Sequence, residues 1–200
     1  MLYYQYPLLT PAQCSHYIDY YNSKQHAHFR LDWPDVNRNH SLLLVNPAHD
    51  LWHQLTSAVT QRHQEINQAL GLSAQTDIKF FDVFISKYTV GEQVLWHVDR
   101  PLFQKDTSTE IQPKNPRLYN VSVNLNQDYT GGDLAVRDSQ QSIRIEKALP
   151  GIATSFSIKN QHQVDTVTCG ERYSLITWVY ADAPEYYKGC DTNKWVYCNK

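Results

Sequence analysis

Apolar side chains recur at helical spacing in two segments of the first 71 residues. The first segment runs from residue 11 to about residue 22, with apolar side chains at Cys14, Tyr17, Ile18 and Tyr21. Thr10 and Gln13 stand where a capping box would close its first turn, with proline at the first helical position. The second segment, residues 47–70, keeps the same period and stops at Gly71, a residue type that favours helix ends. The pattern therefore predicts two helices.

Beyond Gly71 the apolar residues occur in short runs rich in β-branched and aromatic side chains. Gly, Pro, Asn and Asp separate most of these runs, which are Ile78–Val90, Val94–Val98, Leu118–Leu125, Leu134–Val136, Ile143–Ile145, Ile152–Ile158 and Tyr173–Tyr180. Runs of this length and spacing are typical of a sandwich or jelly roll and not of alternating βαβ units. A similar run at 41–45 predicts a strand before the second helix, and the polar stretch 23–35 predicts a loop.

Length and composition favour one globular domain. The chain has 200 residues, of which 42% are hydrophobic and 19% charged. We expect a helical part at 1–71, a β core at 78–180 and a tail at 181–200. The net charge of -2 leaves no basic excess to neutralise phosphates, which disfavours a nucleic-acid partner held by electrostatics.

The N-terminus and the cysteines bear on location. The first residues lack the basic and apolar regions of a signal peptide, and no run approaches the roughly 18 apolar residues that a membrane span needs. Four cysteines without C-x-x-C spacing predict free thiols in a reducing cytosol, although Cys190 and Cys198 are close enough in sequence to pair under oxidation. We therefore expect a cytoplasmic protein with no membrane partner.

The strongest local signal for chemistry is the run Trp96-His97-Val98-Asp99. On an extended segment side chains alternate, so His97 and Asp99 share a face and can bind one ion. A third ligand is needed, and His162 at the start of a later extended stretch is the best candidate. Two histidines and one carboxylate leave three positions open on Fe(II), which suits a bidentate co-substrate plus dioxygen better than a catalytic zinc site does.

A second signal lies in Gly170-Glu171-Arg172-Tyr173-Ser174. The Arg172 guanidinium can bind a carboxylate with two parallel hydrogen bonds, and Ser174 faces the same way and can add a hydroxyl. An ion with open positions beside such a clamp suits a 2-oxo diacid. Its 1-carboxylate and keto oxygen would bind the iron while its far carboxylate pairs with Arg172.

Each of these features has an ordinary structural alternative. Alone, His97 and Asp99 would more often be a surface pair on a strand, and Arg172 a salt-bridged strand residue. Trp96 can equally wall a pocket or pack in the core. The other paired histidines are expected at the surface, because His26-x-His28 has no adjacent carboxylate and Asp50 replaces the glutamate that an HExxH site would need at His49 and His53.

The order of the motifs resembles a known family. In sequence they are Tyr88-x-x-Gly91, His97-x-Asp99, Gly131-Gly132-Asp133-Leu134, Pro150-Gly151, His162-x-Val164 and Gly170-x-Arg172-x-Ser174-Leu175. Over residues 78–180 this series is similar to the Fe(II)/2-oxoglutarate dioxygenases of the prolyl-4-hydroxylase-like group. The resemblance implies a mainly β fold, with a double-stranded β-helix (jelly-roll) core and the N-terminal helices packed on one side.

The resemblance also implies cofactors and residue roles. Fe(II) would be held by His97, Asp99 and His162, and 2-oxoglutarate by Arg172; ascorbate is a further candidate cofactor. Tyr88 matches a position that can reach the co-substrate or substrate. Some relatives hold the far carboxylate with a tyrosine where this chain has Asn124, which leaves Ser174 or Tyr88 as substitutes.

The reaction implied is hydroxylation of a C–H bond, coupled to conversion of 2-oxoglutarate to succinate and CO2. The carboxylate of Asp99 disfavours a halogenase. A nucleic-acid demethylase is disfavoured by the net charge and by the absence of a second arginine between Ser174 and Tyr180. The expected substrate is a prolyl or other side chain of a peptide or protein. A free amino acid or other small molecule is the alternative, and a non-catalytic jelly-roll module that binds a metal or ligand is the alternative of another class.

Substrate contacts are predicted beside the metal ligands, at Trp96 and Arg100. Arg100 opens a polar-leaning connection that reaches Pro116 between two predicted strands. Connections this long in compact domains are usually functional lids or disordered. Its polarity is compatible with covering an extended peptide.

Overall fold

The computed structural model describes residues 1–30, 40–72, 78–80, 82–99, 102–105, 111–115, 117–145 and 148–180. Its helical elements are α1 (Pro11–Ser23), η1 (Gln25–Ala27, a 3-10 turn) and α2 (Asp50–Leu70). Its strands are β1 (Tyr4–Pro7), β2 (Phe29–Arg30), β3 (Ser41–Val45), β4 (Lys79–Phe80), β5 (Val83–Tyr88), β6 (Val94–His97), β7 (Leu102–Lys105), β8 (Ile111–Asn115), β9 (Arg117–Asn124), β10 (Tyr129–Gly131), β11 (Leu134–Arg137), β12 (Ser142–Ile145), β13 (Ile152–Ser157), β14 (Gln161–Val164), β15 (Val167–Gly170) and β16 (Arg172–Tyr180).

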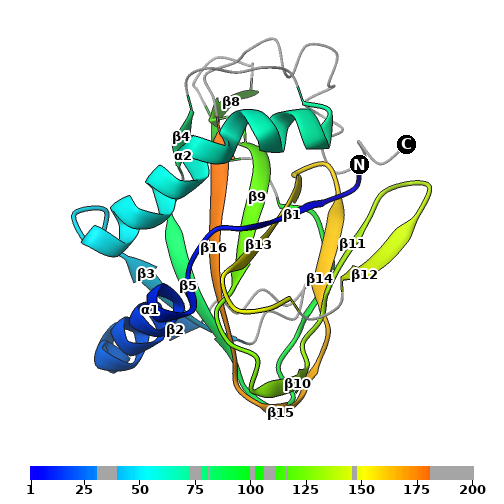
Figure 1. The fold of residues 1–200 in the computed structure, drawn as a ribbon. Helices are drawn as coiled ribbons and strands as arrows, with labels where there is room; N and C mark the ends of the chain where they lie inside the picture. Colours follow the sequence, from blue (N-terminus) through cyan, green and yellow to red (C-terminus); the bar gives the residue numbers. More distant parts are fainter. Residues whose placement is uncertain are drawn as a thin grey trace.

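Two antiparallel sheets face each other in the core (Figure 1). The larger has the order β1-β13-β9-β16-β5-β3-β2, with β4 added beside β16, and the smaller has the order β12-β11-β14-β6. In a jelly roll, strands that are distant in sequence pair within one sheet, as β9 does between β13 and β16. The jelly-roll prediction is therefore confirmed.

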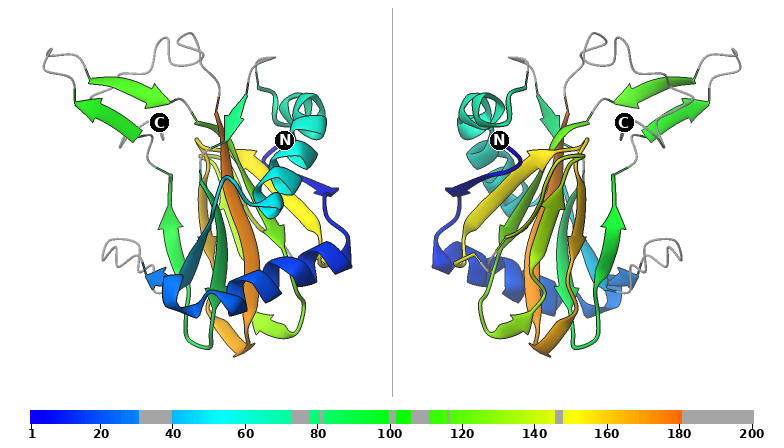
Figure 2. Two further views of the ribbon diagram at one scale, coloured as in Figure 1. Left: turned by 90° about the vertical axis from the view of Figure 1, so that its left-hand side faces the viewer. Right: turned by 90° about the vertical axis from the view of Figure 1, so that its right-hand side faces the viewer.

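Both helices pack on the outer face of the larger sheet, as predicted (Figure 2). The main hydrophobic cluster joins Tyr17 of α1 and Leu55 of α2 to Val121 of β9 and Leu175 of β16, all of them fully buried. A helix that buries one apolar stripe against a sheet gains most of its stability there and not from intrinsic propensity. The opposite face of this sheet is left to line the interior between the two sheets.

The predicted helix ends are largely confirmed. The Thr10 hydroxyl accepts from the backbone N–H of Gln13, and the Gln13 side chain accepts from the backbone N–H of Thr10, which completes the capping box. The second helix ends at Gly71 in the left-handed conformation, with φ +65°. It begins at Asp50 and not at residue 47, because His49 forms the N-cap and its Nδ1 accepts from the backbone N–H of Leu51.

The N-terminal part is less purely helical than expected. Strand β1 pairs with β13 at one edge of the large sheet, and β2 and β3 extend its other edge. The stretch expected to be a loop contains η1 and β2 within its described residues. The run Ile78–Val90 holds two strands, β4 and β5, in place of one. Short edge strands of this kind owe their conformation to hydrogen bonds from a partner strand, so apolar periodicity does not reveal them.

The long polar connection contains a hairpin. Strands β7 and β8 pair antiparallel within it, and Figure 2 shows them projecting beyond the two large sheets. Arg100, Cys190 and Cys198 lie outside the described residues. Cys14 is buried and Cys169 exposed, and both are free thiols. Across the described residues, the structure contains no helix long and apolar enough to span a membrane.

Candidate active site

A pocket lies between the two sheets and encloses about 690 Å³, its open mouth included. Residues of the large sheet (β3, β5, β9, β13 and β16) and of the small sheet (β6, β11 and β14) line it together. Its walls are mainly apolar, formed by Leu42, Phe84, Val94, Leu134, Phe156, Val164 and Ile176. Polar side chains gather in two groups, one around Asp99 and the other around Arg172, as is common in small-molecule sites.

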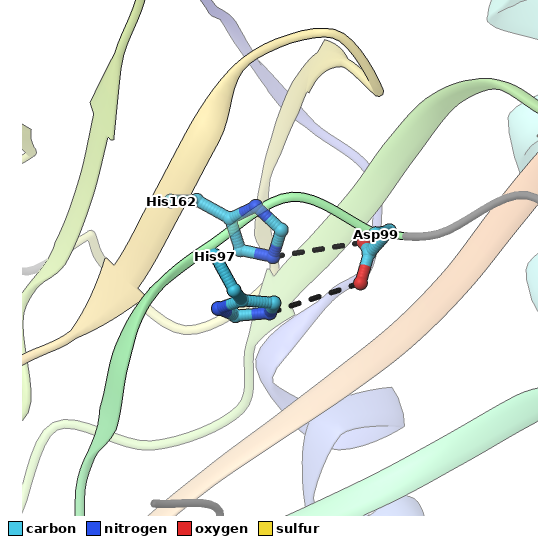
Figure 3. Close-up of side chains that lie close together, drawn as sticks. All are labelled: His97, Asp99 and His162. Atoms are coloured by element: carbon cyan, nitrogen blue, oxygen red, sulfur yellow. Dashed lines mark ion pairs between the residues drawn. The ribbon is translucent and has the colours of Figure 1, made fainter. Parts of the chain in front are cut away.

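The first group contains His97, Asp99 and His162. His97 ends β6 and pairs in register with His162 of β14, which puts the two imidazoles side by side with ring centroids 4.1 Å apart. Asp99 follows β6 by two residues and returns to the same face. One ligand atom from each residue lies within 4.8 Å of the other two, and Figure 3 shows the three side chains pointing toward one another.

The protonation of His97 is set by its backbone contact. Its Nδ1 lies 2.8 Å from the carbonyl oxygen of Leu95, and a carbonyl can only accept. Nδ1 therefore carries a proton, and Nε2, which lies 3.7 Å from Asp99 Oδ1, is the ring nitrogen left to face a metal ion. A second hydrogen bond that fixes the tautomer in this way is usual for a metal-binding histidine.

Asp99 is buried, with 7% of its surface exposed. Its Oδ2 accepts from Asn120 Nδ2 at 2.8 Å and from Trp178 Nε1 at 2.7 Å, and it lies 3.6 Å from His162 Nε2. The two donors fix the orientation of the carboxylate beside the two imidazoles. Two imidazoles and a carboxylate form the donor set of non-haem Fe(II) sites, so these residues fit that ion. In the described part of the chain they form the one group of three or more such ligands.

The second group lies around Arg172 at the start of β16. Arg172 Nη1 donates to Ser174 Oγ at 3.1 Å, and the guanidinium carbon lies 5.1 Å from the centroid of the Tyr88 ring. Register pairing of β5 with β16 places Tyr88 opposite Arg172 and Ser86 opposite Ser174. Arg172, Ser174, Ser86 and Tyr88 are all at most 4% exposed. The three residues that the sequence associates with 2-oxoglutarate therefore share one wall.

Two buried polar atoms in this group have no hydrogen-bond partner among the described residues: Arg172 Nε and Ser86 Oγ. Burying such groups unpaired is costly, about 1–3 kcal/mol each. Arg172 lines the pocket, so a carboxylate bound at this end would supply an acceptor for its Nε. The geometry thus fits an anionic group at one end of the pocket and a cation at the other.

Asn124, where some relatives have a tyrosine, is fully engaged in the structure. Its Nδ2 donates to the carbonyls of Asn126 and Ala148, and its Oδ1 accepts from the Tyr129 hydroxyl at 2.9 Å. Burial raises the pKa of Tyr129, and the positive charge of nearby Arg172 opposes this rise. Tyr129 of β10 thus brings a phenol to the side of Arg172, a contact that sequence reasoning missed.

His40, which belongs to none of the sequence motifs, lines the pocket. It is 4% exposed, and its ring stacks on Tyr88 with centroids 4.3 Å apart. Trp96, a predicted substrate contact, is not among the pocket-lining residues in the described part of the chain. Its ring lies 4.2 Å from the guanidinium carbon of Arg137. Arg100 falls outside the described residues.

Gly132 explains part of the Gly131-Gly132 motif. Its φ is +67°, and a Cβ at this position would lie 2.9 Å from Arg172 Cδ and 3.0 Å from Val167 Cγ2. We expect Gly132→Ala to displace Arg172 and to weaken 2-oxoglutarate binding about tenfold or more, since each tenfold step needs only about 1.4 kcal/mol. The measurement is the dissociation constant of 2-oxoglutarate for the metal-loaded protein.

Gly71→Ala is the matched control for Gly132→Ala. Gly71 has nearly the same φ, +65°, but a Cβ added there would meet no other atom within 4 Å. Both variants should lose about 1 kcal/mol of stability from the left-handed backbone. Only Gly132→Ala should lose 2-oxoglutarate affinity, and equal affinities in the two variants would contradict the crowding of Arg172.

Comparison with known proteins identifies a family. The sequence pattern of the 2OG-Fe(II) oxygenase superfamily matches residues 83–180, which include every residue of the two polar groups. His40 lies outside this range. A PKHD-type hydroxylase of Psychrobacter sp. is 27% identical over 143 residues, covering 70% of this chain and 52% of the relative. The chain spans about half the length of the curated relatives it matches.

Solved structures share the fold at low sequence identity. A Pseudomonas putida prolyl-4-hydroxylase superimposes with a TM-score of 0.68 at 18% identity, covering 91% of this chain and 94% of that chain. A Trichoplax adhaerens prolyl hydroxylase, solved with a peptide fragment of the hypoxia-inducible factor oxygen degradation domain, gives 0.68 at 16% identity, covering 90% of this chain and 83% of that chain. The arrangement of sheets and helices is thus that of prolyl hydroxylases.

Proposed function

Because this chain belongs to the 2OG-Fe(II) oxygenase superfamily, we propose that its pocket binds Fe(II) and 2-oxoglutarate to hydroxylate a C–H bond. The observation that carries the proposal is that one pocket holds both a His-Asp-His group and a buried arginine fork. A jelly-roll module that only binds a ligand would need one of these groups, not both.

Residues at one end of the pocket would bind the metal ion, and residues at the other end would bind the carboxylate of the co-substrate. His97, Asp99 and His162 would hold the iron, whose open positions activate dioxygen and bind the 2-oxo acid. Arg172 and Ser174 would receive the far carboxylate, with the guanidinium over the Tyr88 ring and the Tyr129 side chain next to Arg172. The apolar walls between the two ends exclude water, which strengthens both charge interactions.

We propose a prolyl or other side chain of a peptide or protein as the substrate. A prolyl hydroxylase of the same fold has been solved with a peptide, and a sequence relative bears the name PKHD-type hydroxylase. The hairpin β7–β8 begins three residues after Asp99 and projects beyond the two sheets, and we propose that it contacts an extended peptide. The net charge of -2 gives no support to a nucleic-acid substrate.

The test uses the purified full chain with Fe(II), 2-oxoglutarate and ascorbate. We expect Fe(II)-dependent formation of succinate, faster in the presence of proline-containing peptides than of free amino acids. Mass spectrometry of the accepted peptide should show a gain of one oxygen, about 16 Da. No binding of 2-oxoglutarate by the Fe(II)-loaded protein would overturn the oxygenase proposal, and a mass gain on free amino acids alone would overturn the peptide substrate.

A further inference from the structure

Two side chains that belong to no sequence motif both donate to Asp99. Asn120 comes from β9 and Trp178 from β16, and the two are register partners on adjacent strands of the large sheet. Asn120 Nδ2 lies 2.8 Å and Trp178 Nε1 2.7 Å from the same carboxylate oxygen, Oδ2. Asp99 itself lies beyond the end of β6, so its carboxylate is fixed by the opposite sheet and not by its own strand.

We propose that Asn120 and Trp178 are positioning residues that hold the Asp99 carboxylate ready for the metal ion. This inference rests on the proposed function, which supplies the ion. Two charge-assisted hydrogen bonds on Oδ2 reduce its capacity to bind a cation and so favour ligation through Oδ1. They also restrict rotation of the carboxylate before the ion arrives. Binding then costs less conformational entropy, and the site is preorganised.

The contact with Asp99 determines which way the Asn120 side-chain amide points. With Nδ2 toward Asp99 its amide donates to a carboxylate, whereas the flipped amide would direct Oδ1 at another oxygen. Asn120 is 3% exposed, and its Oδ1 has no hydrogen-bond partner among the described residues. Burying an asparagine whose amide oxygen has no partner costs free energy, so this residue is a poor choice for simple core packing. Its position therefore favours a role at the site.

Trp178 is held in place from two sides. The Phe84 ring meets the indole at 75° with centroids 6.0 Å apart, and the Arg117 guanidinium carbon lies 4.5 Å from the indole centroid. Arg117 is 8% exposed, so its charge is weakly screened. A cation over the indole face draws electron density from the ring and strengthens its N–H as a donor. Arg117 thereby acts on Asp99 through Trp178.

The experiment is a titration of the metal-free full chain with Co(II), followed by visible absorption and calorimetry. Trp178→Phe keeps an aromatic ring and removes the donor, and Asn120→Leu keeps the volume and removes the amide. Each is expected to bind Co(II) about 10- to 100-fold more weakly than the wild type, as is usual when the group that orients a metal ligand is lost. The Co(II) absorption bands should also change, because the Asp99 carboxylate is then free to coordinate the ion in a different way.

Leu175→Met is the matched control. Leu175 lies on the same strand as Trp178, but it packs in the main hydrophobic cluster and is not among the pocket-lining residues of the described part of the chain. Its variant should keep wild-type Co(II) affinity. Arg117→Leu leaves both donors in place and should weaken Co(II) binding about two- to fivefold through the indole alone. This milder variant tests the same proposal if either donor variant fails to fold, as judged by circular dichroism.

The outcomes distinguish a failure of the proposed function from a failure of the positioning role. A wild-type protein that binds no Co(II) and forms no succinate with Fe(II) overturns the proposed function itself. A wild-type protein that binds Co(II), with folded donor variants and Arg117→Leu matching its affinity and spectrum, overturns the positioning role alone. Weaker binding by the folded variants, with Leu175→Met unchanged, supports it.

Discussion

Asp99→Ala is expected to lower the affinity for Co(II) or Fe(II) by more than about 100-fold and to abolish Fe(II)-dependent succinate formation. Loss of a group that merely orients a ligand costs about 10- to 100-fold, and Asp99 would be the ligand itself. It is also the one carboxylate in the His-Asp-His group, so its removal leaves two neutral imidazoles facing the ion. Titration with Co(II) and an assay for succinate measure the two effects.

Asp19→Ala and His16→Ala serve as controls for this prediction. Both residues are exposed on α1, on the outer side of the large sheet, and both variants should keep wild-type metal affinity and turnover. Because Asp99 also accepts from Asn120 and Trp178, the melting temperature of metal-free Asp99→Ala must be recorded beside its affinity. A folded Asp99→Ala that retains Fe(II)-dependent turnover would contradict the assignment.

Arg172→Leu is expected to raise the KM for 2-oxoglutarate about 10- to 100-fold, because hydrogen bonds to a charged partner contribute about 1.5–3 kcal/mol. Its guanidinium would be lost from the end of the pocket where Ser174 Oγ accepts from it at 3.1 Å. Affinity for Co(II) should stay close to wild type, since Arg172 is not one of the three grouped ligands. The measurement is initial rate against 2-oxoglutarate concentration.

Arg172→Lys separates charge from shape. A lysine keeps the positive charge but not the planar fork, so we expect a KM between those of the wild type and Arg172→Leu. Arg137→Lys is the matched control, because the Arg137 guanidinium stacks on Trp96 and Arg137 does not line the pocket. If Arg172→Lys and Arg172→Leu both kept the wild-type KM, the co-substrate carboxylate would have to bind elsewhere.

Much of the fold was accessible from local patterns. Period and caps predicted α1 and most of α2, and short β-branched runs predicted β3, β9 and β13 within a residue or two. The edge strands β1 and β2 were not predicted, because their sequences contain no run of apolar residues. Their backbone groups are satisfied by β13 and β3, which are known only once the chain has folded.

For the site, spacing alone linked some residues and missed others. His97 and Asp99 stand two apart on an extended segment, and Arg172, Ser174, Ile176 and Trp178 alternate along β16, so a shared face for Trp178 and Arg172 was readable in principle. Asn120 is likewise one of the inward polar positions of β9, beside Ser122 and Asn124. Alternation along one strand does not indicate which strand of the other sheet its side chains will face.

Local periodicity and the chemistry of each side chain were enough to predict both helices, most core strands, a sandwich or jelly roll, and the residue types able to hold an ion and a carboxylate. The folded chain alone shows that His162 pairs with His97, that Asn120 and Trp178 donate to Asp99, and that Tyr129 and His40 lie beside Arg172 and Tyr88 respectively. The reason is physical: these contacts form between residues far apart in the chain, and strand register, not local sequence, sets which of them meet.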